Sequence, residues 1–264
     1  MKGSAKPRSS TTRQHLPAQN RSLERGLEIL RAFRPGTDLL GNGDIAEKTG
    51  IARATVSRLT QTLVHAGMLE YDRSARAYRV GVATLSLALA MRASNPVLQT
   101  AMPLMRQASE RLRVNVGLAT PDRQDMVYLE SIRYNRRPAL RTVVSGQRIP
   151  IELTSLGRAY LAAAPAQERD AFLAILQTRN PARAKMLERQ ILEAVESVRV
   201  NGFCAAAWQL DVVAVATPIV LPDSPIYALN MSVAGRDPLV TVVTTLRGPL
   251  LELRGAIVET LMSQ

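Results

Sequence analysis

Residues 21–80 constrain the fold of this chain most, because three short helical patterns are followed there by two short alternating ones. In RSLERGLEILRAF (21–33) apolar side chains recur every three or four residues, which predicts an amphipathic helix. Its apolar stripe comprises Leu23, Leu27, Leu30 and Phe33. Two further helices are predicted, over 42–49 and 53–66, and each is followed by a glycine suited to a left-handed helix end.

A hairpin pattern follows the third helix. In LEYDRSARAYRV (69–80) apolar and polar side chains alternate on two arms, and the residues between the arms, 72–75, suit a turn. Three helices followed by a hairpin are the parts of a winged helix-turn-helix. The sequence therefore predicts this fold for residues 21–80.

The third helix has two unlike faces. At about 100° per residue, one face gathers apolar side chains that should pack on the first two helices. These are Val56, Leu59, Leu63 and Ala66. The side chains of the other face are short or form hydrogen bonds, which suits entry into the major groove. A solvated face of a structural helix has the same composition and is the alternative.

Candidate DNA contacts follow from this face and from the hairpin tip. Bases are expected to be read by Thr55, Ser57, Arg58 and Gln61, with Ala54 and Thr62 beside them. Phosphates are expected to be contacted by Arg53, Arg73 and Arg76.

The charge of the chain favours the same partner. The formal net charge is +12 and the sequence pI is about 10.7. Residues 1–20 hold four basic and no acidic side chains, few apolar ones, and are expected to form a disordered basic tail. A polyanion such as double-stranded DNA is therefore the expected partner.

Several classes of protein are disfavoured by what the sequence holds. Two histidines and one cysteine cannot assemble the usual zinc site, and the sequence has no phosphate-binding loop. No cofactor, no metal and no enzymatic activity are therefore expected. The chain also has no apolar run of the roughly 18 residues a membrane span needs, and no secretory signal, so a cytoplasmic protein without membrane contact is expected.

A family resemblance extends these observations. The segments RSLERGLEILRAF, DIAEKTGIARATVSRLTQTLVHAGMLEYD and AYRVG resemble the DNA-binding half of the IclR family of bacterial regulators. The resemblance implies that ATVSRLTQTL is the recognition helix. It continues in GVATLSLALAMRAS (81–94), which would be a linker helix. This helix is apolar nearly all round, should be buried, and pairs with its dimer mate in the family.

The remainder, residues 95–264, resembles the family's effector-binding and oligomerisation domain, an α/β fold of the GAF-like kind. SGQRIPIELTSLGRAYLAA (145–163) is similar to the signature of that domain. Helices are expected near 95–112, 166–176, 182–200 and 238–262, and strands near 114–120, 125–132, 211–220 and 225–234.

The resemblance also implies a pocket for a small organic acid, for which an aromatic acid is one candidate. The matching positions are Ile149, Ser155, Leu156, Ala214, Asn230 and Ser232. Ser155 would lie near a helix start that favours an anion, with the helix N-cap role as the alternative. Residues 201–219 are about two residues shorter than the matching segment of the family and have a reduced acidic cluster. Cys204 and Trp208 are therefore further candidates, whose roles stay open.

The expected function is that of a transcription regulator, repressor or activator, whose operator binding is controlled by the effector. A homodimer or homotetramer is expected to hold two winged helices on a pseudo-palindromic site, with RNA polymerase as a further candidate partner. The alternatives are an enzyme, or a ligand-sensing protein whose winged helix does not bind DNA.

Overall fold

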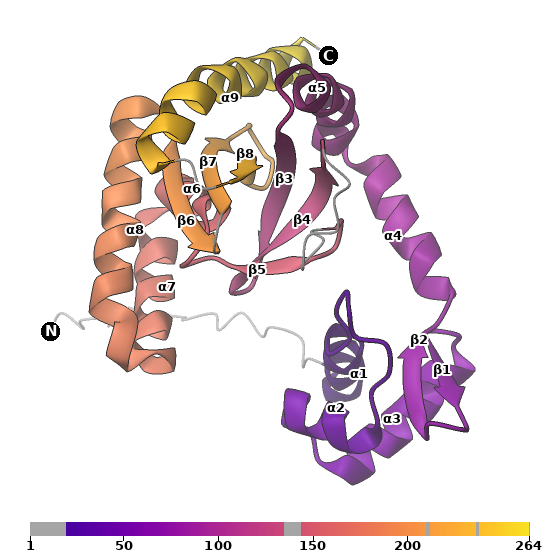
Figure 1. Ribbon diagram of the computed structural model, residues 1–264. Coiled ribbons are helices and arrows are strands. Elements are labelled where there is room, and N and C mark those ends of the chain that lie inside the picture. The colour runs from indigo at the N-terminus through magenta and orange to yellow at the C-terminus, as the bar shows by residue number, and fades with distance from the viewer. Residues whose placement is uncertain (1–19, 135–143, 210–211, 236–237, 264) are drawn as a thin grey trace, which may run out of the picture. The chain divides into compact units, whose positions relative to one another are not determined.

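The structure is a computed structural model that describes residues 20–134, 144–209, 212–235 and 238–263. The tail expected over residues 1–20 lies outside this part, apart from Asn20. The chain divides into two compact units (Figure 1). Unit 1 is Met1–Phe33 with Thr37–Ala83, and unit 2 is Arg34–Gly36 with Thr84–Gln264. Within the described residues, no helix is long and apolar enough to cross a membrane.

Unit 1 is the predicted winged helix-turn-helix. Its elements are α1 (Arg21–Arg31), α2 (Asn42–Thr49), α3 (Arg53–His65), β1 (Leu69–Asp72) and β2 (Ala77–Val80). Asn20 caps α1, because its side chain accepts hydrogen bonds from the N–H groups of Ser22 and Leu23. Gly50 ends α2 at a φ of 69°, a left-handed conformation that glycine adopts without a Cβ clash. The strands β1 and β2 pair antiparallel as the wing.

The buried faces of α1 and α3 differ from the predicted stripes. On α1, Ile29 is fully buried, whereas Leu23 and Leu27 are 63% and 50% exposed. On α3, Thr60 is fully buried and Ala66 is exposed. The predicted packing of Ala66 was therefore wrong, and the apolar stripe of α1 is only partly covered. A helical period gives the spacing of a stripe, but the neighbouring helices decide which stripe is covered.

Unit 2 adds the remaining elements around one sheet. They are α4 (Ala83–Ser94), α5 (Pro96–Leu112), β3 (Asn115–Asp122), β4 (Asp125–Ile132), β5 (Arg148–Pro150), α6 (Ser155–Ala163), α7 (Ala166–Arg179), α8 (Pro181–Asn201), β6 (Cys204–Gln209), β7 (Val212–Ile219), β8 (Tyr227–Ala234) and α9 (Leu239–Met262). The described strands pair antiparallel in the order β5-β4-β3-β8-β7-β6. The predicted two-part architecture, a winged helix-turn-helix followed by an α/β domain, is confirmed.

The strand β6 was not predicted. Its sequence, CAAAWQ, contains three alanines, which have weak strand propensity. It becomes an edge strand because β7 supplies hydrogen-bonding partners, with Cys204 opposite Ala216 and Ala206 opposite Ala214.

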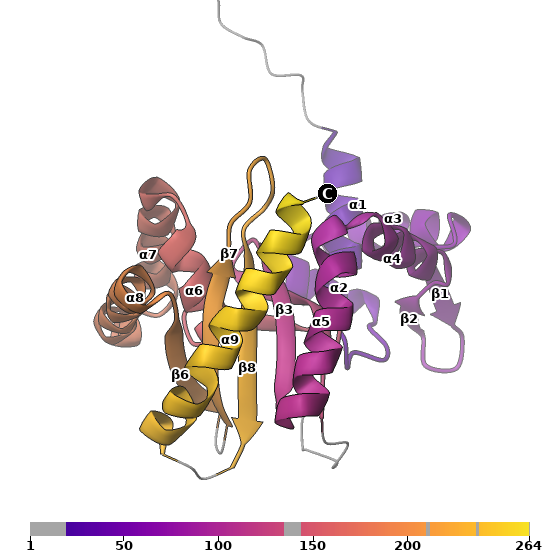
Figure 2. The same ribbon diagram turned by 90° about the horizontal axis from the view of Figure 1, so that it is seen from above.

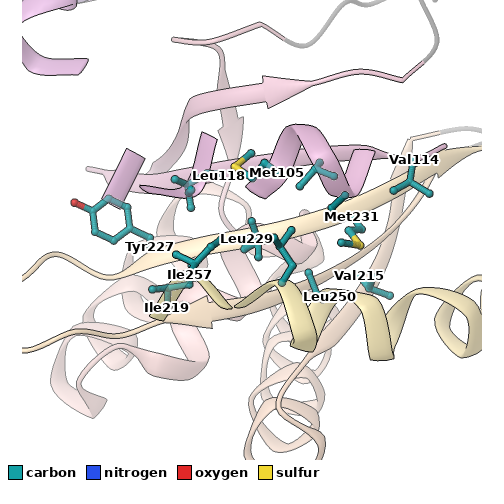
Figure 3. Packing of buried hydrophobic residues seen from close by; sticks show 14 of the residues in the cluster. Met105, Val114, Leu118, Val215, Ile219, Tyr227, Leu229, Met231, Leu250 and Ile257 are labelled. Carbon is teal, nitrogen blue, oxygen red and sulfur yellow. The ribbon is translucent and has the colours of Figure 1, made fainter. Parts of the chain in front are cut away.

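Helices cover both faces of the sheet (Figures 1 and 2). On one face α5 and α9 lie side by side across the strands. Figure 3 shows the large side chains buried there: Met105 from α5, Leu250 and Ile257 from α9, and Leu118, Val215, Leu229 and Met231 from the strands. On the other face α6 contacts β7 and β8 and packs against α8, with α7 beyond it. Small side chains from the strands, including Ala119, Ala216 and Ala228, face α6.

The helix α4 is exposed in the single chain, although its apolar sequence predicted burial. None of its described residues is buried, and Leu85, Leu87 and Leu89 are 55–59% exposed. The expectation of burial therefore fails for one chain taken alone, because none of the residues that the structure describes covers this helix.

The glycine at the start of α6 determines how closely that helix approaches the preceding segment. A Cβ at Gly157 would lie 2.2 Å from the carbonyl oxygen of Ile151, which is backbone and cannot rotate away. We predict that Gly157→Ala destabilises the protein by about 2–3 kcal/mol. Gly255→Ala is the matched control, since Gly255 lies in α9 with nothing near its Cβ position, and it should stabilise by about 0.5–1 kcal/mol. Urea midpoints measure both, and equal midpoints would contradict this account.

Candidate DNA-binding surface and effector site

The predicted DNA contacts on α3 lie on its outer side. Val56 and Thr60 are fully buried and face the core, and Ile29 and Ile45 pack in the same cluster as Val56. The exposed predicted contacts are Arg53, Ala54, Arg58, Gln61 and Thr62, and those partly exposed are Thr55 and Ser57. Unit 1 therefore presents the candidate base-reading side chains together on one surface.

The packing of α3 on α2 holds this surface in place. The hydroxyl of Thr60 lies 3.4 Å from Oδ1 of Asn42, and it also donates to the carbonyl of Val56 at 3.0 Å. In the same first turn of α2, Asp44 caps the helix, because its Oδ2 accepts from the N–H of Gly41 at 2.8 Å. Thr60 was placed on neither face in the sequence reasoning, and its buried position becomes clear only from its neighbours.

The turn of the wing is organised by Asp72. Its Oδ1 accepts from the N–H and the hydroxyl of Ser74 at 2.9 and 2.5 Å, and from the N–H of Ala75 at 3.0 Å. Its Oδ2 pairs with Arg79. The hydrogen bond from the Ser74 side chain, followed by the one from the Ala75 N–H, lowers the pKa of Asp72 to about 2.

The arginines of the wing follow from this turn. Arg73 and Arg76 are both exposed, and Arg76 has a φ of +50°. The turn brings both side chains to the tip of the hairpin. Sequence reasoning predicted this turn but missed the role of Asp72, for which the short spacing of Asp and Ser is the available signal.

The candidate effector residues lie on the face of the sheet that α6 covers. Across the strands, Cys204 is opposite Ala216, Ala216 is opposite Asn230, and Asn230 is opposite Gly117. Directly paired residues of antiparallel strands point to the same face, so these side chains form one row. A second pair, Ala214 opposite Ser232, lies beside them. Ile149 and Leu156 belong to the same buried cluster as Cys204 and Ala216.

The start of α6 adds backbone groups to this face. Thr154 is the N-cap, because its hydroxyl oxygen accepts from the N–H of Gly157 at 3.1 Å. The alternative that Ser155 is the N-cap is therefore wrong. Ser155 is the first helical residue, 2% exposed, and its carbonyl accepts from the Cys204 thiol at 3.4 Å. The first N–H groups of a helix have no acceptor within the helix, so this end favours an anion.

Sequence reasoning missed Tyr128 on β4. Its hydroxyl and the side chain of Asn230 share a hydrogen bond, and burial raises the pKa of Tyr128 to about 12. Gly117 makes this contact possible, because a Cβ there would lie 2.5 Å from Cε1 of Tyr128 and 2.6 Å from Oδ1 of Asn230. The pairing joins three strands, and no local sequence pattern announces it.

The other candidates contribute less. Ser232 is only half-buried, and the side chain of Trp208 lies outside the described residues, as does Asp211. Burial raises the pKa of the Cys204 thiol to about 12, so this group is a neutral, unreactive thiol near pH 7. Among the described residues, no group of three or more His, Cys, Asp or Glu side chains could hold a metal ion.

The raised pKa of Tyr128 gives a pH dependence with a definite sign. The folded state holds the neutral phenol, so its contribution to stability is complete below pH 10 and is lost as the pH rises towards about 12. We predict that Tyr128→Phe reduces the loss of unfolding free energy between about pH 10 and 12. Tyr71→Phe, which changes a tyrosine 46% exposed, should leave the slope as in the parent. Identical slopes in all three proteins would refute the burial of the phenol.

Comparisons with known proteins match both units. Residues 22–73 match the IclR helix-turn-helix domain, and residues 89–236 match the family described as bacterial transcriptional regulator IclR C-terminal. The HTH-type transcriptional regulator TsaQ1/TsaQ2 of Comamonas testosteroni is 38% identical over 153 residues, and that match covers 56% of this chain and 54% of the relative. The chain thus spans about half the length of this relative.

Solved structures share the fold over nearly the whole chain. The crystal structure of an IclR family transcriptional regulator from Brucella abortus has 30% identity and a TM-score of 0.80, covering 96% of both chains. An IclR homologue of Microbacterium hydrocarbonoxydans, complexed with 4-hydroxybenzoate, has 22% identity and a TM-score of 0.68, covering 92% of this chain and 100% of that one. The chain belongs to the IclR family of bacterial transcriptional regulators.

Proposed function

We propose that this protein binds an operator through α3 and the wing, and that a small organic acid bound in unit 2 controls this binding. The observation that carries the proposal is the polar, exposed outer side of α3 next to two exposed wing arginines. Membership of a family of transcriptional regulators supports it. In this reading the protein acts on DNA in the cytoplasm, turns over no substrate, and contacts RNA polymerase only as a bound regulator.

The two kinds of DNA contact come from different places: base contacts from the exposed side of α3, and phosphate contacts from the first residue of α3 and from the wing. Arg58, with Thr55, Ser57 and Gln61, would read base edges, because these groups are exposed or partly exposed on α3. Ala54 and Thr62 are small enough to let α3 approach the groove. Arg53, Arg73 and Arg76 would bind phosphates, which fixes the register of the protein on any sequence.

Fluorescence anisotropy with duplexes that tile the DNA upstream of the gene tests the proposal. One tile should bind about a thousandfold more tightly than a scrambled duplex at the same salt. Arg58→Ala should reduce this ratio by about tenfold, whereas Arg73→Ala should weaken binding to both duplexes alike. Arg199→Ala, on α8, is the control and should change neither.

Three outcomes would count against the proposal. Equal losses on both duplexes for Arg58→Ala would remove this residue from base reading. Failure to bind any duplex would leave a winged helix without DNA-binding function, and turnover of a candidate effector would favour an enzyme.

For the effector we propose a small aromatic acid at the α6 face. The N–H groups at the start of α6, at Ser155 and Leu156, favour a carboxylate. Tyr128 and Asn230 offer a neutral phenol and an amide at the other side of the same buried face, which suits a hydroxyl group on the ligand. Ile149, Leu156, Ala214 and Cys204 supply an apolar wall, and Ser232 and Trp208 stay candidates at its edge. The bound 4-hydroxybenzoate of the Microbacterium homologue has both groups.

We further propose that α4 pairs with α4 of a second copy, as the resemblance implied, in a homodimer or homotetramer. An exposed helix of twelve residues is marginal in water, so its apolar side chains need a cover. Leu89→Glu should lower the mass measured by analytical ultracentrifugation to that of the monomer. Leu192→Glu, on α8 and 47% exposed, is the matched control and should keep the parent mass. A Leu89→Glu protein of parent mass would contradict the pairing.

A further inference from the structure

The last turn of α4 is attached to unit 2 by Arg92. Its Nη1 donates to the carbonyl of Leu129 on β4, and its Nη2 donates to Oε2 of Glu130 at 2.6 Å. Its own carbonyl accepts from Nε2 of Gln99 on α5 at 2.8 Å. The Arg92 and Glu130 side chains are 25% and 18% exposed, unlike the leucines earlier in α4. Arg92 therefore connects a largely exposed helix to the interior of the sheet.

Glu130 is held from three sides. Besides Arg92, the N–H of Ser131 donates to its Oε1 at 2.9 Å, and the hydroxyl of Ser145 donates to the same oxygen at 3.1 Å. Burial alone would raise the pKa of Glu130, but these hydrogen bonds together lower it, so the carboxylate stays ionised near pH 7. The Arg92–Glu130 pair is thus a charged, well-anchored contact.

The strand β4 has an irregularity at this point. Leu118 is opposite Glu130, but the next residue of β3, Ala119, is opposite Tyr128. Leu129 is therefore the extra residue of a β-bulge, the residue whose carbonyl Arg92 binds. A bulge leaves its residue outside the regular ladder, bends the strand and changes the direction of the neighbouring side chains.

The two residues that flank the bulge serve different contacts. Tyr128 reaches across Gly117 to Asn230 on the candidate effector face. Glu130 binds Arg92 of α4. A ligand that engages Tyr128 thus acts one residue from the Leu129 carbonyl that Arg92 holds. Because the chain between Tyr128 and Glu130 is a single strand with one unpaired residue, a shift at one end changes the position of the other.

We propose that Arg92 is a positioning residue, which couples the effector face to the orientation of the linker helix α4 through the bulge at Leu129. This inference rests on the proposed function. It makes the ion pair with Glu130 part of the response to the effector and not only of the stability of unit 2. Loss of Arg92 then uncouples α4 without removing any group of the effector site or of the DNA-binding surface.

The test compares Arg92→Gln, Arg92→Lys and Arg199→Gln with the parent. Arg199 is a matched control, because it pairs with Glu196 on α8 at 2.5 Å and is exposed. Operator affinity is measured with and without 4-hydroxybenzoate, and the affinity for 4-hydroxybenzoate is measured by calorimetry. The parent and Arg199→Gln should change operator affinity by about tenfold on adding the acid. Arg92→Gln should bind the acid within about twofold of the parent, yet change operator affinity less than about twofold.

Arg92→Lys distinguishes coupling from simple loss of charge. Lysine keeps the charge beside Glu130 but cannot bind this carboxylate and the Leu129 carbonyl with a planar fork, so an intermediate response is expected. A full response in Arg92→Gln, equal to that of Arg199→Gln, would overturn the inference. So would a response lost only in proportion to lost affinity for the acid.

A second readout needs neither DNA nor ligand. Tyr128→Phe removes the hydroxyl that binds Asn230, and it should increase hydrogen exchange of residues 83–94 by about threefold in the parent. In the Arg92→Gln background the same change should add nothing, whereas additive effects would overturn the coupling. If the parent binds no duplex or ignores the acid, the proposed function fails and this exchange cycle alone decides the inference.

Discussion

At the centre of the unit 2 sheet, β8 pairs with β3 on one side and with β7 on the other, each in an antiparallel register. Side chains along a strand alternate between faces, so these two registers determine which side chains of the sheet face which helices. Leu229 and Met231 point to α5 and α9, and Asn230 between them points to α6. A slip of one residue would bring leucine to the candidate effector face and asparagine into the apolar core. The large apolar cluster under α9 therefore fixes Asn230 and the small residues of its row on the opposite face.

In unit 1, the helix α3 likewise has a buried face and an exposed face with different roles. Val56 and Thr60 face inward, and the hydroxyl of Thr60 satisfies its own helix and approaches α2, so no apolar residue is needed at that position. The exposed side chains of α3 are therefore not needed for packing and are available for contacts with DNA. In the wing, Asp72 has a comparable role, because its carboxylate accepts hydrogen bonds from the turn, while Arg73 and Arg76 are exposed at the tip. In both places a small polar group organises the backbone, and a neighbouring side chain faces outward.

The element order and the two-part architecture could be predicted from the sequence, because helical periods, glycines at helix ends and the hairpin pattern are local signals. It did not decide which stripe of α1 is buried, since Leu23 and Leu27 have the same spacing as the stripe that includes Ile29. It also missed β6, whose alanines become a strand only beside β7. For the effector face, the resemblance indicated Ser155, Leu156 and Asn230, but the Tyr128–Asn230 contact joins residues about a hundred positions apart. Such contacts depend on register, which no single segment encodes.

The close approach at Gly117 has a consequence for how this protein can diverge. The ring of Tyr128 and the amide of Asn230 occupy the space that any side chain at position 117 would need. A side chain at position 117 therefore fits only if both Tyr128 and Asn230 move or become smaller, while a smaller residue at position 128 alone leaves a void. If ligands bind at this candidate face, their recognition is expected to change through coupled substitutions at these positions rather than one at a time. A change of ligand in this lineage would then pass through an intermediate of lower stability.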